Sequence, residues 1–152
     1  ATDLFDLFRD FYQDFDYDKA LAMCRSLGVE PKDRLKSMSK GTKEKVQLVL
    51  VMARKAQLYL LDEPTTGLHP RDIEHFLILL DRLADAGNTV VVVEHNQQLI
   101  ENSDWVIDLG PDGGDSGGRV MFEGTPEEMR LRGKSITAKY LHRDLPLHSG
   151  HW

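Results

Sequence analysis

The sequence predicts an α/β fold, in which a mostly parallel sheet of about four strands is flanked by helices and preceded by a helical segment. Two observations predict it. From residue 58 onward, short apolar runs alternate with segments of helical periodicity. Before that point, apolar side chains recur at helical spacing. Since 152 residues suffice for one core, we expect a single compact domain over 1–145, with a helical segment (1–37) and an α/β core (38–145).

Three helices are predicted before the first strand. Residues 3–13 and 18–27 have the spacing of amphipathic helices, and Asp18 is the predicted cap of the second. A third helix begins with Ser39 and Gly41 and runs to about residue 56. The helical segment therefore leads directly into the first strand.

Four strands are predicted after these helices. Residues 58–61 form the first, and Pro70 then begins a long helix, since proline is tolerated in the first turn. Residues 89–93 are an unalternated β-branched run, which is typical of a parallel strand buried on both faces. The third and fourth strands, 105–109 and 119–123, are expected to pair antiparallel. The remaining predictions are short helices from 126 and over 136–142, and a tail, 146–152, that resembles an expression tag.

The composition excludes several functions. A net charge of −6 disfavours nonspecific binding to phosphate backbones and anionic membranes, so we expect neither nucleic acid nor membrane as a partner. The single cysteine, Cys24, cannot form an internal disulfide and is expected to be buried. No targeting segment or membrane span is evident, which predicts a cytoplasmic, soluble protein. The spacings of the six histidines match no metal site.

An apolar strand that ends in adjacent carboxylates, Asp62 and Glu63, is the most informative feature of the chain. This is the Walker B arrangement, in which one acid holds the Mg²⁺ of a nucleotide and the next polarises the attacking water. The phosphate loop that such a site needs, G-x-x-x-x-G-K-[ST], matches no window of the 152 residues. Gly133 and Lys134 match the end of this pattern, but Glu128 occupies the position of its first glycine. The glycine pairs within 113–118 are better interpreted as a hairpin loop.

Four motifs in order resemble those of ATP-binding-cassette (ABC) ATPases. They are Ser39 to Lys43, then Asp62 to Pro64, then Gly67 to Pro70, and finally His95 at the end of the next strand. Residues 4–63 resemble the helical subdomain and signature helix of a bacterial ABC-transporter ATPase. Residues 63–145 resemble the carboxy-terminal end of the damage-recognition ATPase of the ABC excinuclease, which acts in nucleotide excision repair. The resemblance implies a fold derived from the P-loop NTPases.

The resemblance also implies roles for single residues. Ser39 and the N–H of Gly41 would contact the γ-phosphate of a nucleotide held by a second subunit. Asp62 would bind Mg²⁺ through water, Glu63 would be the general base, and His95 would touch the γ-phosphate. Lys40, where many members have glycine, departs from the pattern, as does His69, which replaces the aspartate of transporters. Without a phosphate loop we expect no catalysis by the chain alone, and ATP and Mg²⁺ as cofactors only with a complementing partner.

Three functions follow as hypotheses. The first is an engineered or recombined chimera of two ABC ATPase fragments, joined within residues 60–64 and without activity of its own. The second is a half-site ATPase subunit that completes an ATP site with a partner that carries the phosphate loop. The third is a docking module that uses its two aromatic amino-terminal helices.

The resemblance implies that a strand is missing between residues 89–93 and 105–109, which would leave unpaired strand edges. Such edges are costly when buried and adhesive when exposed. We expect the chain to close the gap by pairing residues 105–109 directly with 90–93. The alternative is a homodimer that pairs the open edges of two copies.

Overall fold

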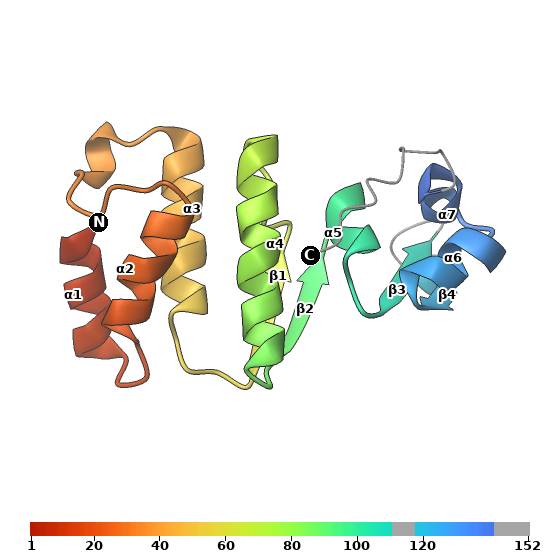
Figure 1. Ribbon diagram of the computed structural model, residues 1–152, viewed down its shortest axis with the longest axis horizontal. Helices are drawn as coiled ribbons and strands as arrows, with labels where there is room; N and C mark the ends of the chain where they lie inside the picture. Colours follow the sequence, from red (N-terminus) through yellow and green to blue (C-terminus); the bar gives the residue numbers. More distant parts are fainter. Residues whose placement is uncertain (111–117, 142–152) are drawn as a thin grey trace. The chain divides into compact units, whose positions relative to one another are not determined.

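The computed structural model describes residues 1–110 and 118–141 and divides the chain into two compact units, Ala1–Glu94 and His95–Trp152 (Figure 1). The α/β fold class is confirmed. The expected single domain over 1–145, with its helical segment and α/β core, stays a prediction. The four predicted strands are present. In the described residues they form two two-stranded sheets. The predicted tail and most of the predicted hairpin loop lie outside the described residues.

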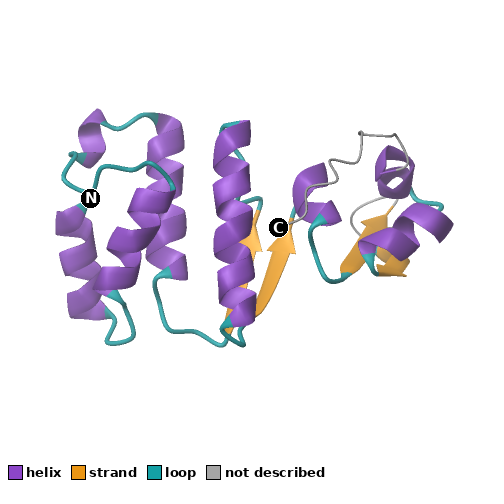
Figure 2. Cartoon of the chain, in the orientation of Figure 1, coloured by secondary structure: helices purple, strands orange, loops and turns teal. Residues whose placement is uncertain are grey.

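The first unit begins with three helices that lie side by side, α1 (Thr2–Phe11), α2 (Tyr17–Ser26) and α3 (Lys40–Met52), with a short 3₁₀ helix η1 (Leu35–Ser37) before α3 (Figures 1 and 2). Each helix was predicted within a few residues. The cap of α2 differs, because Asp16, not Asp18, accepts the hydrogen bond from the Lys19 N–H. Asp18 lies in the first turn, where a carboxylate interacts favourably with the positive end of the helix dipole. The best-buried side chains of this segment include Phe5, Cys24, Leu27, Val46, Val49 and Met52.

The sheet of the first unit pairs β1 (Leu58–Asp62) with β2 (Thr89–Val93) in parallel, and α4 (Pro70–Asp85) provides the crossover between them. Tyr59 and Leu61 are buried, whereas Leu58 and Leu60 are 60% and 67% exposed. Since alternate residues of a strand point to opposite faces, one face of this sheet is covered and the other is not. The prediction that residues 89–93 are buried on both faces is therefore wrong.

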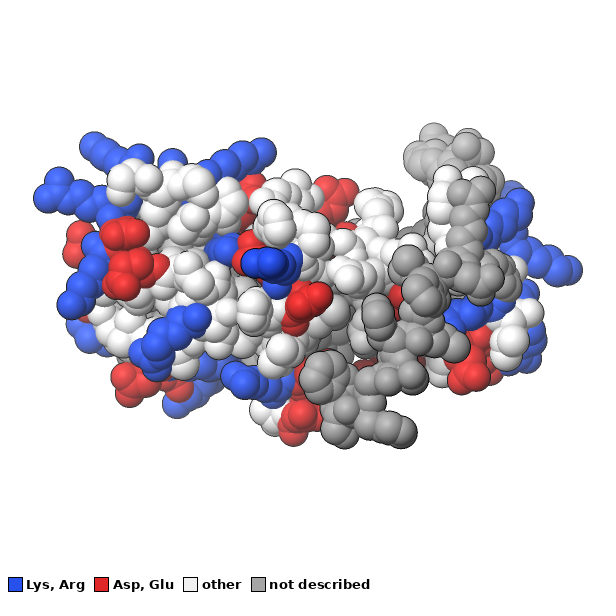
Figure 3. Space-filling view, turned by 45° about the horizontal axis from the view of Figure 1, so that its top comes forward, with Lys and Arg blue, Asp and Glu red and all other residues white. Residues whose placement is uncertain are grey.

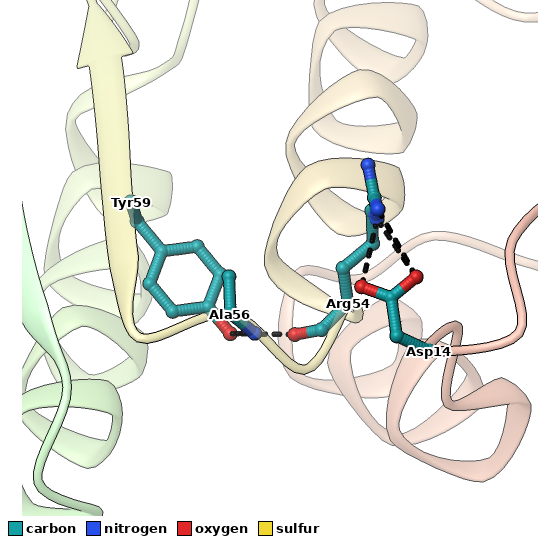
Figure 4. Close-up of polar contacts among 4 residues, drawn as sticks. All are labelled: Asp14, Arg54, Ala56 and Tyr59. Carbon is teal, nitrogen blue, oxygen red and sulfur yellow. Dashed lines mark hydrogen bonds and ion pairs between the residues drawn. The ribbon is translucent and has the colours of Figure 1, made fainter.

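Figure 4 shows how β1 is attached to the helices before it. The hydroxyl of Tyr59 donates to the Arg54 carbonyl at 2.5 Å and accepts from the Ala56 N–H at 3.3 Å. The Arg54 side chain in turn binds the Asp14 carboxylate, with Nη2 and Oδ1 3.0 Å apart. These contacts fix the start of β1 to the end of α3 and to the loop before α2.

The second unit contains α5 (Gln97–Glu101), β3 (Val106–Gly110), β4 (Arg119–Gly124), α6 (Pro126–Arg132) and α7 (Ile136–Leu141). The strands β3 and β4 pair antiparallel, as predicted, with an irregularity between Asp108 and Leu109. A capping box of Thr125 and Glu128 starts α6. The small core of this unit comprises Met129, Ala138 and Leu141, with Ile100, Val106 and Phe122 packed against it.

The expected pairing of residues 105–109 with 90–93 is wrong, because β2 pairs with β1 and β3 pairs with β4. The antiparallel partner of β3 is close in sequence, and the short connection between them favours this pairing. The homodimer through an open sheet edge stays a prediction.

Candidate nucleotide site

The two carboxylates at the end of β1 are exposed, and a tight turn follows them. We call residues 62–66 the acidic turn. The N–H of Glu63 donates to the Val93 carbonyl at 2.8 Å, and the Thr66 N–H donates to the Glu63 carbonyl at 3.1 Å. Glu63 has φ of 42°, and no other non-glycine residue in the described part of the chain has positive φ. Such a conformation costs about 1–3 kcal/mol and is found mainly at functional sites.

The amino terminus of α3 is capped as the sequence predicted. The Ser39 hydroxyl oxygen accepts the Thr42 N–H at 3.1 Å and lies 2.8 Å from the Thr42 hydroxyl. Both Ser39 and Lys40 are exposed, and Lys40 Nζ lies 3.9 Å from Glu44 Oε1. Ser39 is thus at the surface of the first unit, where a ligand could reach it.

The segment that directly follows the acidic turn comes close to the start of α3 at two glycines, Gly41 and Gly67. A Cβ atom added to Gly41 would lie 3.0 Å from the Gly67 carbonyl oxygen. A Cβ atom on Gly67 would lie 1.9 Å from Glu44 Oε2, and Gly67 has φ of +78°. A side chain on Gly41 would press against the Gly67 backbone, whereas a side chain on Gly67 would displace the end of the Glu44 side chain. Glycine at these two positions therefore allows the start of α3 to lie close to the segment after the acidic turn.

His95 directly follows Glu94 and is the first residue of the second unit. It stands between β2 and α5, whose cap is Asn96. The Asn96 side chain accepts from the N–H groups of Gln98 and Leu99, at 2.9 and 3.4 Å. Of the five predicted site residues, Asp62 and Glu63 share the lining of one groove, described next, and Ser39 and Gly41 lie at the start of α3.

A groove of about 360 Å³ separates α3 from the end of β1 and the acidic turn. Its lining contains the carboxylates of Glu44, Asp62 and Glu63 and no lysine or arginine. Carboxylates suit Mg²⁺, but nucleotide phosphates require N–H groups and cations. The described residues hold no cluster of three or more acidic, histidine or cysteine side chains arranged for a metal. The lining therefore does not fit a nucleotide.

Sequence reasoning missed three polar residues that support this region. Lys45 Nζ lies 2.7 Å from Asp72 Oδ1 and donates to the Leu27 carbonyl at 3.1 Å, which ties α3 to α4 and to the end of α2. Glu94 accepts the Thr65 N–H at 2.9 Å. These partners lie far apart in sequence, and no local pattern indicates such contacts.

Comparison with solved structures defines the class of the fold as that of the ABC-type ATPases. UvrA2 from Deinococcus radiodurans superposes with a TM-score of 0.71 at 39% identity, covering 93% of this chain and 18% of that one. A dimeric bacterial ABC transporter cassette gives a TM-score of 0.53 at 25% identity, covering 60% of this chain and 41% of that one. Residues 32–101 match the family described as "AAA domain, putative AbiEii toxin, Type IV TA system".

Within this class the chain resembles the UvrA proteins. The UvrABC system protein A of Thermus thermophilus is 53% identical over 110 residues, which are 70% of this chain and 11% of that protein. The Aquifex aeolicus protein is 48% identical over 112 residues, 72% of this chain and 12% of that protein. The chain thus spans about a ninth of the length of these relatives.

Within the ranges 1–110 and 118–141, no helix is long and apolar enough to cross a bilayer.

Proposed function

We propose that this chain is a half-site module of an ABC-type ATPase, which contributes a signature helix and a Walker B segment and needs a partner that carries the phosphate loop. The observation that carries the proposal is the close approach of Gly41, at the start of α3, to Gly67, the residue that follows the acidic turn. In this reading Ser39 and Gly41 bind phosphate, Asp62 binds Mg²⁺ and Glu63 is the base. ATP and Mg²⁺ are bound only in the completed site.

The acidic groove supports the further proposal that the chain alone is not an enzyme. Phosphoryl transfer depends almost entirely on positioning and charge stabilisation. The described lining offers carboxylates where phosphates would need cations, so a nucleotide has no cradle there. A partner with a lysine and N–H groups would supply this missing half.

The test is complementation in trans. The partner is an ABC ATPase subunit with an intact phosphate loop, inactivated by replacing its own signature serine with arginine. We expect ATP turnover when this chain is added, loss of that turnover with Ser39→Arg, and retention with Ser37→Arg, a nearby exposed control. Absence of turnover in every mixture, despite folded components, would refute the half-site function.

A chimeric origin stays a prediction about the sequence. The UvrA2 structure covers 93% of the chain, and this likeness of fold says nothing of whether the sequence was joined at residues 60–64. The proposed half-site function is the same whether or not the sequence is a chimera.

The docking hypothesis has less support, because two of the aromatic rings of the helical segment, Phe5 and Phe15, are buried. Phe5 is fully buried and lies 6.1 Å from Phe15 between ring centroids, and Phe8 lies 5.8 Å from Phe15. Phe11, at 74%, is the most exposed of the large apolar side chains on α1.

The predicted absence of nucleic acid partners rests on charge alone. On the face drawn in Figure 3, basic side chains lie among acidic ones.

A further inference from the structure

Thr65, in the acidic turn, is bound twice by one carboxylate. Its N–H donates to Glu94 Oε1 at 2.9 Å, and its hydroxyl donates to the same oxygen. Glu94 directly follows β2 and is 29 residues away in sequence. Hydrogen bonds to a carboxylate are among the stronger ones in proteins, so this contact is a firm link between the end of β2 and the turn.

The turn is thereby held at two points by the same end of β2. The Val93 carbonyl accepts the Glu63 N–H, and the Glu94 carboxylate accepts from Thr65. Between these points lies the left-handed backbone of Glu63, with φ of 42°. A residue keeps such a conformation only when its surroundings over-determine it. The two anchors on β2 provide this restraint.

We propose that Glu94 is a positioning residue for Glu63. By holding Thr65, it keeps the Glu63 backbone left-handed and so fixes the direction in which the Glu63 carboxylate leaves the turn. Because Glu94 is attached to β2, a shift of the end of that strand also shifts the turn. The importance of this role for catalysis rests on the proposed half-site function, but the restraint itself belongs to the isolated chain.

Two variants of Glu94 separate the hydrogen bonds from side-chain size. Glu94→Gln retains an acceptor oxygen at the same reach, whereas Glu94→Leu removes it. Thr65→Val removes the hydroxyl and keeps the N–H and the branched shape. Thr66→Val is the control, at an exposed neighbouring threonine. All four are studied as the ¹⁵N-labelled full chain without nucleotide.

The readouts are amide hydrogen exchange and the intraresidue HN–Hα NOE of Glu63, which is strongest when φ is positive because the two protons are then closest. In Glu94→Leu we expect Thr65 exchange to be at least about tenfold faster, since hydrogen bonds to charged groups contribute that much or more. The Glu63 NOE should weaken while the amides of Leu60 and Val91 keep their protection. Glu94→Gln should restore both signals, and Thr65→Val should give a smaller effect. If Glu94 only stabilised the fold, exchange would rise across β1 and β2 together and the NOE would not change.

In a complementation mixture whose partner also has its own Walker B glutamate replaced by glutamine, so that turnover depends on Glu63, Glu94→Leu should lower kcat with little change in the KM for ATP, and Glu94→Gln should stay close to the unsubstituted chain. If the NMR effects appear but no mixture turns over ATP, the half-site function fails and the positioning of Glu63 stands. Unchanged Thr65 exchange and an unchanged intraresidue Glu63 NOE in a folded Glu94→Leu chain would overturn the inference.

Discussion

Arg54 donates a forked pair of hydrogen bonds to the carboxylate of Asp14, Nε to Oδ2 at 3.1 Å and Nη2 to Oδ1 at 3.0 Å. The two residues are 40 positions apart, and the guanidinium carbon also lies 4.1 Å from the centre of the Tyr12 ring. This pair of hydrogen bonds joins the loop before α2 to the residues between α3 and β1.

The first prediction concerns pH. The hydrogen bond from Arg54 lowers the pKa of Asp14 below its ordinary value of 3.8. A lowered carboxyl pKa contributes stability that is present above the unfolded value and is lost as pH falls through the folded value. Asp14→Asn should therefore lower the urea midpoint at pH 7, and this difference should shrink as the pH falls below 3.8. Arg54→Lys, which cannot form the fork, should also lower the midpoint at pH 7. A difference that persists undiminished at low pH would contradict this account.

The second prediction separates a close contact from backbone strain. Gly67 and Gly87 both have positive φ, +78° and +84°, but only Gly67 faces a neighbour, Glu44. Gly87→Ala should cost about 1–2 kcal/mol of unfolding free energy from the left-handed backbone alone. Gly67→Ala should cost more, and adding Glu44→Ala to Gly67→Ala should recover part of the difference. Chemical denaturation measures the unfolding free energy of each variant against the unsubstituted chain. Equal costs for the two glycines would show that the contact with Glu44 is relaxed in solution.

The third prediction concerns the buried thiol. Burial raises the pKa of Cys24 to about 11. At pH 8 roughly one thiol in a thousand is then ionised in the folded chain, so alkylation by iodoacetamide should be slow and should accelerate on unfolding in urea. Because the folded pKa is raised, its contribution to stability is full below the unfolded value near 9 and is lost as pH rises toward 11. Rapid alkylation of the native chain at pH 8 would show that the helical segment opens locally.

The fourth prediction concerns nucleotide affinity. The start of α3 offers only a few N–H donors, so we expect the isolated chain to bind ATP-Mg²⁺ no more tightly than about millimolar. Isothermal titration measures this directly, with Ser39→Arg as the blocked control. Micromolar binding that Ser39→Arg abolishes would mean that the chain builds a complete phosphate site by itself.

Local signals predicted the elements of the fold well. Ser39 caps α3 and Pro70 begins α4, because each effect depends only on nearby residues. Strand pairing was harder to predict, since it depends on which edges meet in space. The resemblance implied a single sheet, whereas β3 pairs only with β4 within the described residues.

In the candidate site, too, local features were predicted from the sequence and contacts between distant residues were not. The sequence identified Asp62 and Glu63 from adjacent carboxylates after an apolar strand. It could not reveal that Glu94 turns back to Thr65, because that contact exists only once β2 lies beside β1. Nor could it show that Gly41 and Gly67 are neighbours, since two glycines leave no mark of their proximity in a single sequence.

The register of the parallel sheet has a consequence for the order of folding. Leu58 pairs with Thr89 and Asp62 with Val93, so the first ladder contact must wait until the intervening chain, α4 included, has closed a long loop. Contacts of such separation form late, after local helices and short hairpins. We therefore expect α1 to α3 and the β3–β4 pair to form before the acidic turn takes its shape. The left-handed backbone of Glu63 would then be among the last features that the chain acquires.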